Sequence, residues 1–107
     1  MPTYNKLVRD NIPQIIQATG KKYSIEVLSD QDYKKYLKQK SYEELDEYCA
    51  AQSSEEAVEE LADLLEVIHA LANFHGSSIE EVENIRKGKA ISRGAFEKKI
   101  LLLDVED

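Results

Sequence analysis

The fold of this chain is decided by residues 41–63, which read SYEELDEYCAAQSSEEAVEELAD. Four acids in this stretch form two pairs with the same spacing: Glu44 and Glu47, then Glu60 and Asp63. Residues three apart share one face of a helix, so each pair projects from one side of its helix. A short polar break at residues 52–54 separates the two pairs. The stretch therefore predicts two adjacent helices whose acidic faces come together.

The composition is that of a globular chain with a single domain, residues 1–107. Hydrophobic residues make up 42% and charged residues 33%, which excludes a disordered chain. The formal net charge of −7 argues against binding to a nucleic-acid polymer or an anionic membrane. No apolar run is long enough to span a membrane. The lone cysteine, Cys49, cannot form an internal disulfide, so we expect a reducing, cytoplasmic location and a small buried side chain there.

Hydrophobic spacing and helix-start residues predict four helices. The first contains Ile12, Ile15 and Ile16 and stops near Gly20. The other three are expected at about 32–51, 54–74 and 79–93. Capping-box patterns mark the starts of the last two: Ser53 with Glu56, and Ser78 with Glu81. Apolar residues nearly encircle the helix at 54–74, so we expect it to be the central and most buried element.

Two further segments have no helical pattern. Residues 23–28 alternate between polar and apolar side chains and read as a strand. Residues 100–104 begin with the apolar run ILLL and can pair with that strand in a two-stranded β ribbon. Such a ribbon must pack on the helices, because it is marginal alone. The predicted fold is therefore mostly all-α, a small bundle of about four helices, with this short ribbon as a possible addition.

The acids of residues 41–63 are anomalous because they interrupt apolar faces. On a helical wheel of about 100° per residue, Glu44 shares its stripe with Leu37, and Glu60 shares its stripe with Val67. Glu43 points away and is expected on the solvated surface. Converging carboxylates on an apolar face are costly unless they are paired or bind a metal, and all-oxygen ligands suit Mg²⁺ or Mn²⁺. The alternative is that these acids reach water at the stripe edges or pair with Lys or Arg.

A basic pair lies on the last predicted helix. Lys89 and Arg93 are four residues apart and share a stripe with Val82 and Ile85. An acidic metal site with two cations nearby is what a triphosphate needs, because the metal bridges phosphate oxygens and the cations neutralise the rest. The alternative is that both cations pair with the acids as structural salt bridges, or cover apolar surface with their stems.

These residues carry a resemblance to a known superfamily. Residues 43–47 and 60–63 resemble the EExxE…ExxD signature of the MazG-like and phosphoribosyl-ATP pyrophosphohydrolase-like superfamily, whose members are all-α nucleoside triphosphate pyrophosphohydrolases. The opening YNKLVRD of residues 4–10 is similar to the start of a small, single-domain branch. The ending KxxxRGxF of residues 89–96 is similar to the same branch, so the resemblance spans most of the chain.

The resemblance implies a Mg²⁺-dependent hydrolase, with Mn²⁺ as an alternative metal, that cuts between the α and β phosphates to give a monophosphate and pyrophosphate. It implies four residues that hold the metal and carry catalysis: Glu44, Glu47, Glu60 and Asp63. It places Lys89 and Arg93 at phosphate-contacting positions. Three more residues are candidates for the site, namely Glu43, Lys6 and Arg9, and the latter two are alternatively salt-bridge residues that fix the first helix. The family assembles as homodimers or homotetramers, so the implied partners are the nucleotide and further copies of this chain.

Three functions are compatible with these patterns. The first is a pyrophosphohydrolase of ordinary, modified or damaged nucleotides in a housecleaning role, which the opening segment favours. The second is phosphoribosyl-ATP cleavage in histidine biosynthesis. The third is non-catalytic. It is either a helical interaction module whose acids form a surface face, which predicts no effect of metal on melting, or a nucleotide-binding sensor that keeps the site but has lost turnover.

Overall fold

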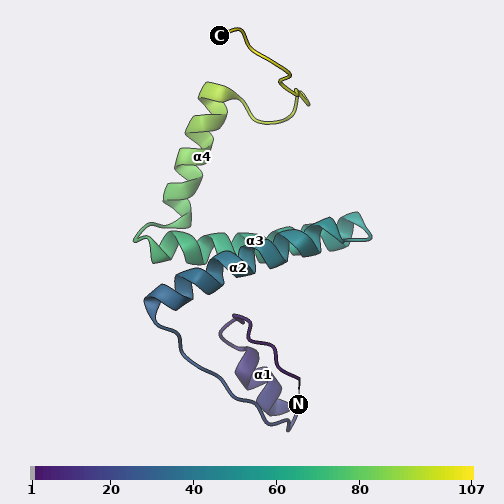
Figure 1. The fold of residues 1–107 in the computed structure, drawn as a ribbon, viewed down its shortest axis with the longest axis vertical. Helices are drawn as coiled ribbons and strands as arrows, with labels where there is room; N and C mark the ends of the chain where they lie inside the picture. The colour runs from purple at the N-terminus through teal and green to yellow at the C-terminus, as the bar shows by residue number, and fades with distance from the viewer. Residues whose placement is uncertain (1) are drawn as a thin grey trace.

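The computed structural model describes residues 2–107 and is all-α, as predicted. Its four helices are α1 (Ile12–Ala18), α2 (Asp30–Cys49), α3 (Ser54–Phe74) and α4 (Ile79–Arg93). The two long helices, α2 and α3, form an antiparallel hairpin, and α1 and α4 extend to opposite sides of it (Figure 1). No described helix combines the length and the apolar character needed to cross a membrane.

Each of the three longer helices begins with a serine cap. The hydroxyl oxygen accepts a hydrogen bond from the backbone N–H three residues later, in the pairs Ser29–Asp32 (3.2 Å), Ser53–Glu56 (3.1 Å) and Ser78–Glu81 (3.2 Å). These bonds satisfy N–H groups that have no partner within the helix. The reciprocal bond of the first capping box is shifted by one residue, because the Glu56 carboxylate accepts from the N–H of Gln52 at 3.2 Å. The predicted helix starts at Ser53 and Ser78 are thus confirmed.

Gly76 ends the hairpin and redirects the chain into α4. Its φ of +73° lies in the left-handed region, which glycine adopts without a steric penalty. The chain therefore leaves the end of α3 sharply, and α4 contacts α3 but not α2 among the described helices. As a result, α4 stands away from the hairpin over most of its length (Figure 1).

A single copy of the chain buries very little apolar surface. Within residues 2–107 the buried apolar side chains are Leu37, Val67 and Ala72. The radius of gyration is 18.2 Å, whereas a compact chain of this length has one of about 13 Å. The helix α3 is central, as predicted, since it contacts both α2 and α4. It is less buried than predicted, because one side carries an exposed apolar row, the α3 stripe: Val58 (64%), Leu61 (46%), Leu65 (48%) and Ile68 (36%).

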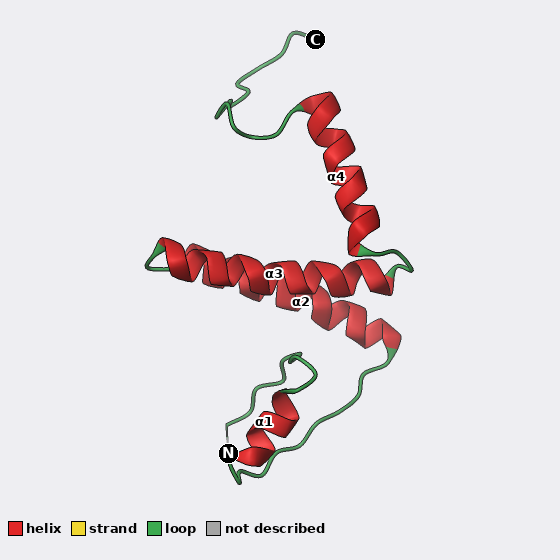
Figure 2. Cartoon of the chain, turned by 180° about the vertical axis from the view of Figure 1, so that it is seen from behind, coloured by secondary structure: helices red, strands yellow, loops and turns green. Residues whose placement is uncertain are grey.

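The β ribbon considered for residues 23–28 and 100–104 is not formed. Neither segment contains a strand, and the two segments lie at opposite ends of the molecule (Figure 2). Their apolar side chains are exposed, with Val27 at 92% and Ile100 at 80%. A two-stranded ribbon needs a helical face to pack on. The chain offers neither segment such a face, so the alternating pattern of residues 23–28 does not produce a strand.

The prediction for Cys49 is also wrong, because its side chain is exposed. Cys49 is the last residue of α2, where the chain turns towards α3. Its small apolar side chain therefore lies at the edge of the hairpin rather than inside it.

Candidate metal and nucleotide site

Three glutamates converge where α2 ends and α3 begins. Glu44 and Glu47 come from the last two turns of α2, and Glu60 comes from the second turn of α3. One carboxylate oxygen from each lies within 4.8 Å of the other two. The short connection at residues 50–53 folds α3 back along α2, which brings these turns side by side. The structure therefore forms, for three of the four predicted acids, the cluster that the sequence pattern indicates.

The burial of this cluster leaves two oxygens without partners. Glu44 is only 5% exposed, and its Oε1 lies 3.3 Å from Nζ of Lys40. Its Oε2 is buried and makes no hydrogen bond within the described chain, and the same holds for Oε2 of Glu60. A buried polar atom without a partner costs free energy, and a buried charge costs more. A divalent cation bound by oxygen ligands would satisfy both atoms, so this donor set fits Mg²⁺ or Mn²⁺.

The electrostatics of Glu44 are consistent with a cation site. Burial raises the pKa of the Glu44 carboxyl above its usual range, because the charged form is disfavoured away from water. The hydrogen bond with Lys40 acts in the opposite direction and lowers this pKa, while the nearby negative charge of Glu47 raises it. A cation bound at this carboxylate would favour its ionised form and so lower the pKa of Glu44.

Asp63, the fourth predicted ligand, does not join the three glutamates. Its Oδ1 lies 2.7 Å from Nη2 of Arg9, and Nη1 of the same arginine lies 3.8 Å from Oε1 of Glu66. Arg9 belongs to the segment before α1, so these ion pairs attach the N-terminal segment to α3. The salt-bridge alternative for Arg9 therefore describes this structure. The assignment of Asp63 as a metal ligand stays a prediction.

Sequence reasoning missed Lys40, which contacts two acids of the motif. Its Nζ lies 3.3 Å from Glu44 and 3.5 Å from Oε2 of Glu43. The Glu43 side chain is only 24% exposed, so the expectation that it lies on the solvated surface is wrong. The spacing in the sequence could have revealed this contact. Lys40 precedes Glu44 by four residues, so the two side chains lie on the same face of α2.

The comparison with known families agrees with this arrangement of acids. A family model described as phosphoribosyl-ATP pyrophosphohydrolase matches residues 5–87, which include both acid pairs, Arg9 and Lys40. The chain belongs to the phosphoribosyl-ATP pyrophosphohydrolase family. This family is part of the MazG-like all-α superfamily, so the resemblance carried by residues 43–47 and 60–63 is confirmed. No curated protein and no solved structure matched the chain.

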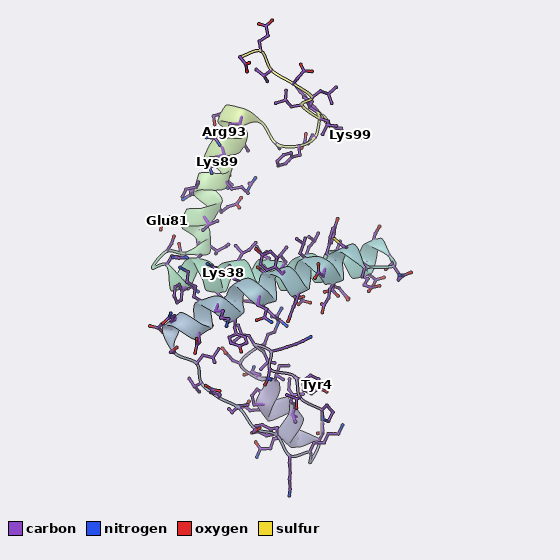
Figure 3. The ribbon with its side chains drawn as sticks, viewed as in Figure 1. Tyr4, Lys38, Glu81, Lys89, Arg93 and Lys99 are labelled. Atoms are coloured by element: carbon purple, nitrogen blue, oxygen red, sulfur yellow. The ribbon has the colours of Figure 1, made fainter. Side chains whose placement is uncertain are left out.

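Membership of the phosphoribosyl-ATP pyrophosphohydrolase family implies a hydrolase that cleaves a pyrophosphate linkage of a nucleotide. Its match ends at residue 87, so it does not include the predicted phosphate-contacting pair on α4. Lys89 and Arg93 are exposed and lie on the half of α4 that is far from α2 and α3 (Figure 3). Lys6 is exposed as well, and it makes no ion pair among residues 2–107. A single copy therefore does not bring Lys89 and Arg93 to the acids, and their role stays a prediction.

Proposed function

We propose that this protein is a Mg²⁺-dependent nucleotide pyrophosphohydrolase that cleaves between the α and β phosphates of a nucleoside triphosphate. The products are a nucleoside monophosphate and pyrophosphate. The observation that carries the proposal is the pair of buried, unpartnered oxygens, Oε2 of Glu44 and Oε2 of Glu60, beside the carboxylate of Glu47. Family membership supports the reaction class. An interaction module whose acids form only a surface face would not account for two buried, unpartnered carboxylate oxygens in one cluster.

In this proposal the glutamates hold the metal and one of them handles the proton. Glu44, Glu47 and Glu60 are the ligands, and Asp63 joins them after it leaves Arg9. The metal, when bound, polarises the phosphoryl group and makes the attacking water more acidic. Glu47 is the solvent-exposed member of the cluster, so it is the carboxylate best placed to accept the proton of that water. Glu44 is too buried for this role and holds its position through Lys40.

A second candidate substrate is phosphoribosyl-ATP, which the description of the matched family favours. The general nucleotide reaction is favoured by the opening segment, residues 4–10, which resembles the small branch. Both substrates have the same scissile linkage, so the acidic cluster serves either reaction. The two candidate substrates differ in the nucleoside portion, which residues outside the acidic cluster must bind.

We further propose that the active form is a homodimer or a homotetramer in the cytoplasm. The small core and the large radius of gyration leave a single copy incompletely packed. Full burial of an aliphatic side chain contributes about 1.5–3 kcal/mol, so covering the α3 stripe would stabilise the chain considerably. A second copy can also bring Lys89 and Arg93 of its own α4 to the acids, which the geometry of one chain does not do.

The test is product analysis. Purified protein is incubated with standard and modified nucleoside triphosphates and with phosphoribosyl-ATP, in Mg²⁺, in Mn²⁺ or in chelator. Pyrophosphate and monophosphate are quantified separately from orthophosphate. Metal-dependent release of pyrophosphate with monophosphate is expected, and the ranking of substrates separates the two candidates. Release of orthophosphate alone, or no product from any substrate, would contradict the proposed reaction.

A further inference from the structure

One lysine of this chain already lies against the predicted metal ligands. Lys40 is on α2 one turn before Glu44, and its ammonium group is 3.3 Å from Glu44 Oε1 and 3.5 Å from Glu43 Oε2. Its side chain is only 26% exposed, so most of its stem is withdrawn from water. Ion pairs with this degree of burial are screened less by salt than surface pairs are. Lys40 is therefore a fixed positive charge at the edge of the acidic cluster.

The position of Lys40 differs from that of the other lysines on α2. Lys34, Lys35 and Lys38 line an open, shallow groove of about 470 Å³ together with Tyr42. Lys38 is exposed, and none of these three forms an ion pair in the part of the chain that the structure describes. Lys38 lies only two positions before Lys40, yet their environments differ because successive helix positions are rotated by about 100°. Lys38 is thus a natural control for Lys40.

A metal ion and Lys40 would compete for the same carboxylate. Glu44 Oε2 is the unpartnered atom, and Oε1 of the same carboxylate holds Lys40. Once a divalent cation binds this carboxylate, its charge neutralises the acid and repels the ammonium group. The stem of Lys40 still keeps that group within reach of the cluster. A polyphosphate bound at the metal would present the anionic oxygens that an ammonium group accepts as partners.

We propose that Lys40 is a substrate-contacting residue, which exchanges Glu44 for a phosphate oxygen of the nucleotide when the metal and the substrate bind. This inference rests on the proposed function. It gives each copy of the chain its own phosphate-binding cation, in addition to any that another copy supplies through Lys89 and Arg93. The contrasting interpretation is that Lys40 only neutralises Glu43 and Glu44, in which case its removal changes stability and metal affinity but not phosphate binding.

The experiment compares Lys40→Met and Lys40→Arg with the matched control Lys38→Met. Methionine keeps most of the apolar stem and removes the charge, and arginine restores the charge. Isothermal titration measures Mn²⁺ binding first, without nucleotide. Binding of pyrophosphate and of a nucleoside triphosphate with a non-hydrolysable α,β-methylene linkage is then measured at saturating Mn²⁺. Circular dichroism checks the helical content of each variant, and Lys40→Gln replaces Lys40→Met if that variant does not fold.

We expect Lys40→Met to bind Mn²⁺ at least as tightly as the unmodified protein, because a competing cation has been removed. The same variant should bind the methylene analogue and pyrophosphate at least about tenfold more weakly, the loss expected for one charge-assisted hydrogen bond. Lys40→Arg should recover most of this affinity, and Lys38→Met should leave both binding constants unchanged. In turnover, the loss should appear mainly in KM rather than in kcat.

Two results would overturn the inference in different ways. If Lys40→Met binds the analogue and pyrophosphate as the unmodified protein does, while only its melting temperature changes, Lys40 is a structural ion-pair residue and the proposed function still stands. If the unmodified protein binds neither Mn²⁺ nor the analogue, the proposed function fails and this inference fails with it. The two failures are distinguishable because the second is visible before any variant is made.

Discussion

Arg9 Nη2 lies 2.7 Å from Oδ1 of Asp63, so the N-terminal segment is attached to α3 at an acid that the sequence assigns to the metal. Asp63 follows Glu60 by three residues and lies on the same side of α3, yet it is held outside the cluster of three glutamates. The guanidinium of Arg9 contacts two acids of α3 through separate nitrogens, Nη2 to Asp63 and Nη1 to Glu66. Metal binding at Asp63 therefore requires that this ion pair open.

Replacing Arg9 should accordingly strengthen metal binding. Both side chains are about half exposed, and an exposed ion pair contributes ~1 kcal/mol or less, so Arg9→Ala should raise Mg²⁺ affinity by up to about fivefold. Calorimetric titration with Mg²⁺ measures this change. The matched control is Arg86→Ala, since Arg86 forms a similarly exposed pair with Glu83 on α4 and should have no effect. Equal Mg²⁺ affinities in the two variants would indicate that Asp63 is not a ligand.

Glu60→Gln should remove hydrolysis and leave the helical fold intact. Changes to residues that merely support metal ligands cost about 10–100-fold in affinity or activity, so loss of a ligand should exceed that range. A neutral amide is less costly to bury than a charge, so the metal-free variant should melt at the same temperature as the parent or higher. Turnover, thermal melting and Mg²⁺ titration are compared with Glu59→Gln, which alters an exposed neighbour on α3. Full activity of Glu60→Gln would show that Glu60 is not a metal ligand that hydrolysis requires.

Much of the fold follows from local sequence signals. Ser53 and Ser78 cap α3 and α4, because each hydroxyl oxygen accepts a hydrogen bond from the backbone N–H three residues later in the sequence. Such a contact depends only on neighbouring residues and can be predicted from them. The pairing of α2 with α3 follows from the short connection between them, and it suffices to bring Glu44, Glu47 and Glu60 together. These features need no information about distant parts of the chain.

The features that could not be predicted depend on contacts between segments that are distant in the sequence. The Arg9–Asp63 pair joins residues 54 positions apart, and the i, i+3 spacing of Glu60 and Asp63 gives no sign of it. The alternating pattern of residues 23–28 predicts a strand only if a partner and a covering face exist, and the fold supplies neither. The exposure of the α3 stripe likewise depends on what lies against α3, because an apolar stripe has the same periodicity whether its own chain or another copy covers it.

The raised pKa of Glu44 predicts how stability changes with pH. A carboxyl that is harder to ionise when folded holds its proton to higher pH in the native state than in the unfolded state. In chelator, Glu44 should therefore lower the free energy of unfolding as the pH rises. The decrease should begin near the ordinary pKa of a carboxyl group and end above the raised pKa of Glu44 in the folded state. Denaturant unfolding across this window measures the slope, and Glu44→Gln should remove that component. The opposite slope for the difference between the two proteins would contradict the burial of Glu44.

Metal binding should show the complementary pH dependence. Mg²⁺ requires the ionised carboxylate, so protons compete with it at Glu44 and its affinity should fall as the pH is lowered through the raised pKa. Saturating Mg²⁺ should correspondingly stabilise the protein more at neutral pH than in acid. Thermal melting with and without Mg²⁺ at several pH values tests this expectation. A stabilisation by Mg²⁺ that does not change with pH would place the ion away from Glu44.

The α3 stripe should be an interface between copies of this chain. Leu65 is 48% exposed at the middle of α3, and an aspartate there would place a charge where we expect apolar packing. Leu65→Asp should therefore shift the protein from a dimer or tetramer towards the monomer and lower its melting temperature, as measured by sedimentation equilibrium and circular dichroism. Ile91→Asp is the control, because Ile91 is 88% exposed on α4 and lies outside the stripe. An unmodified protein that sediments as a monomer, or a Leu65→Asp variant that keeps the parent mass, would show that the stripe is not that interface.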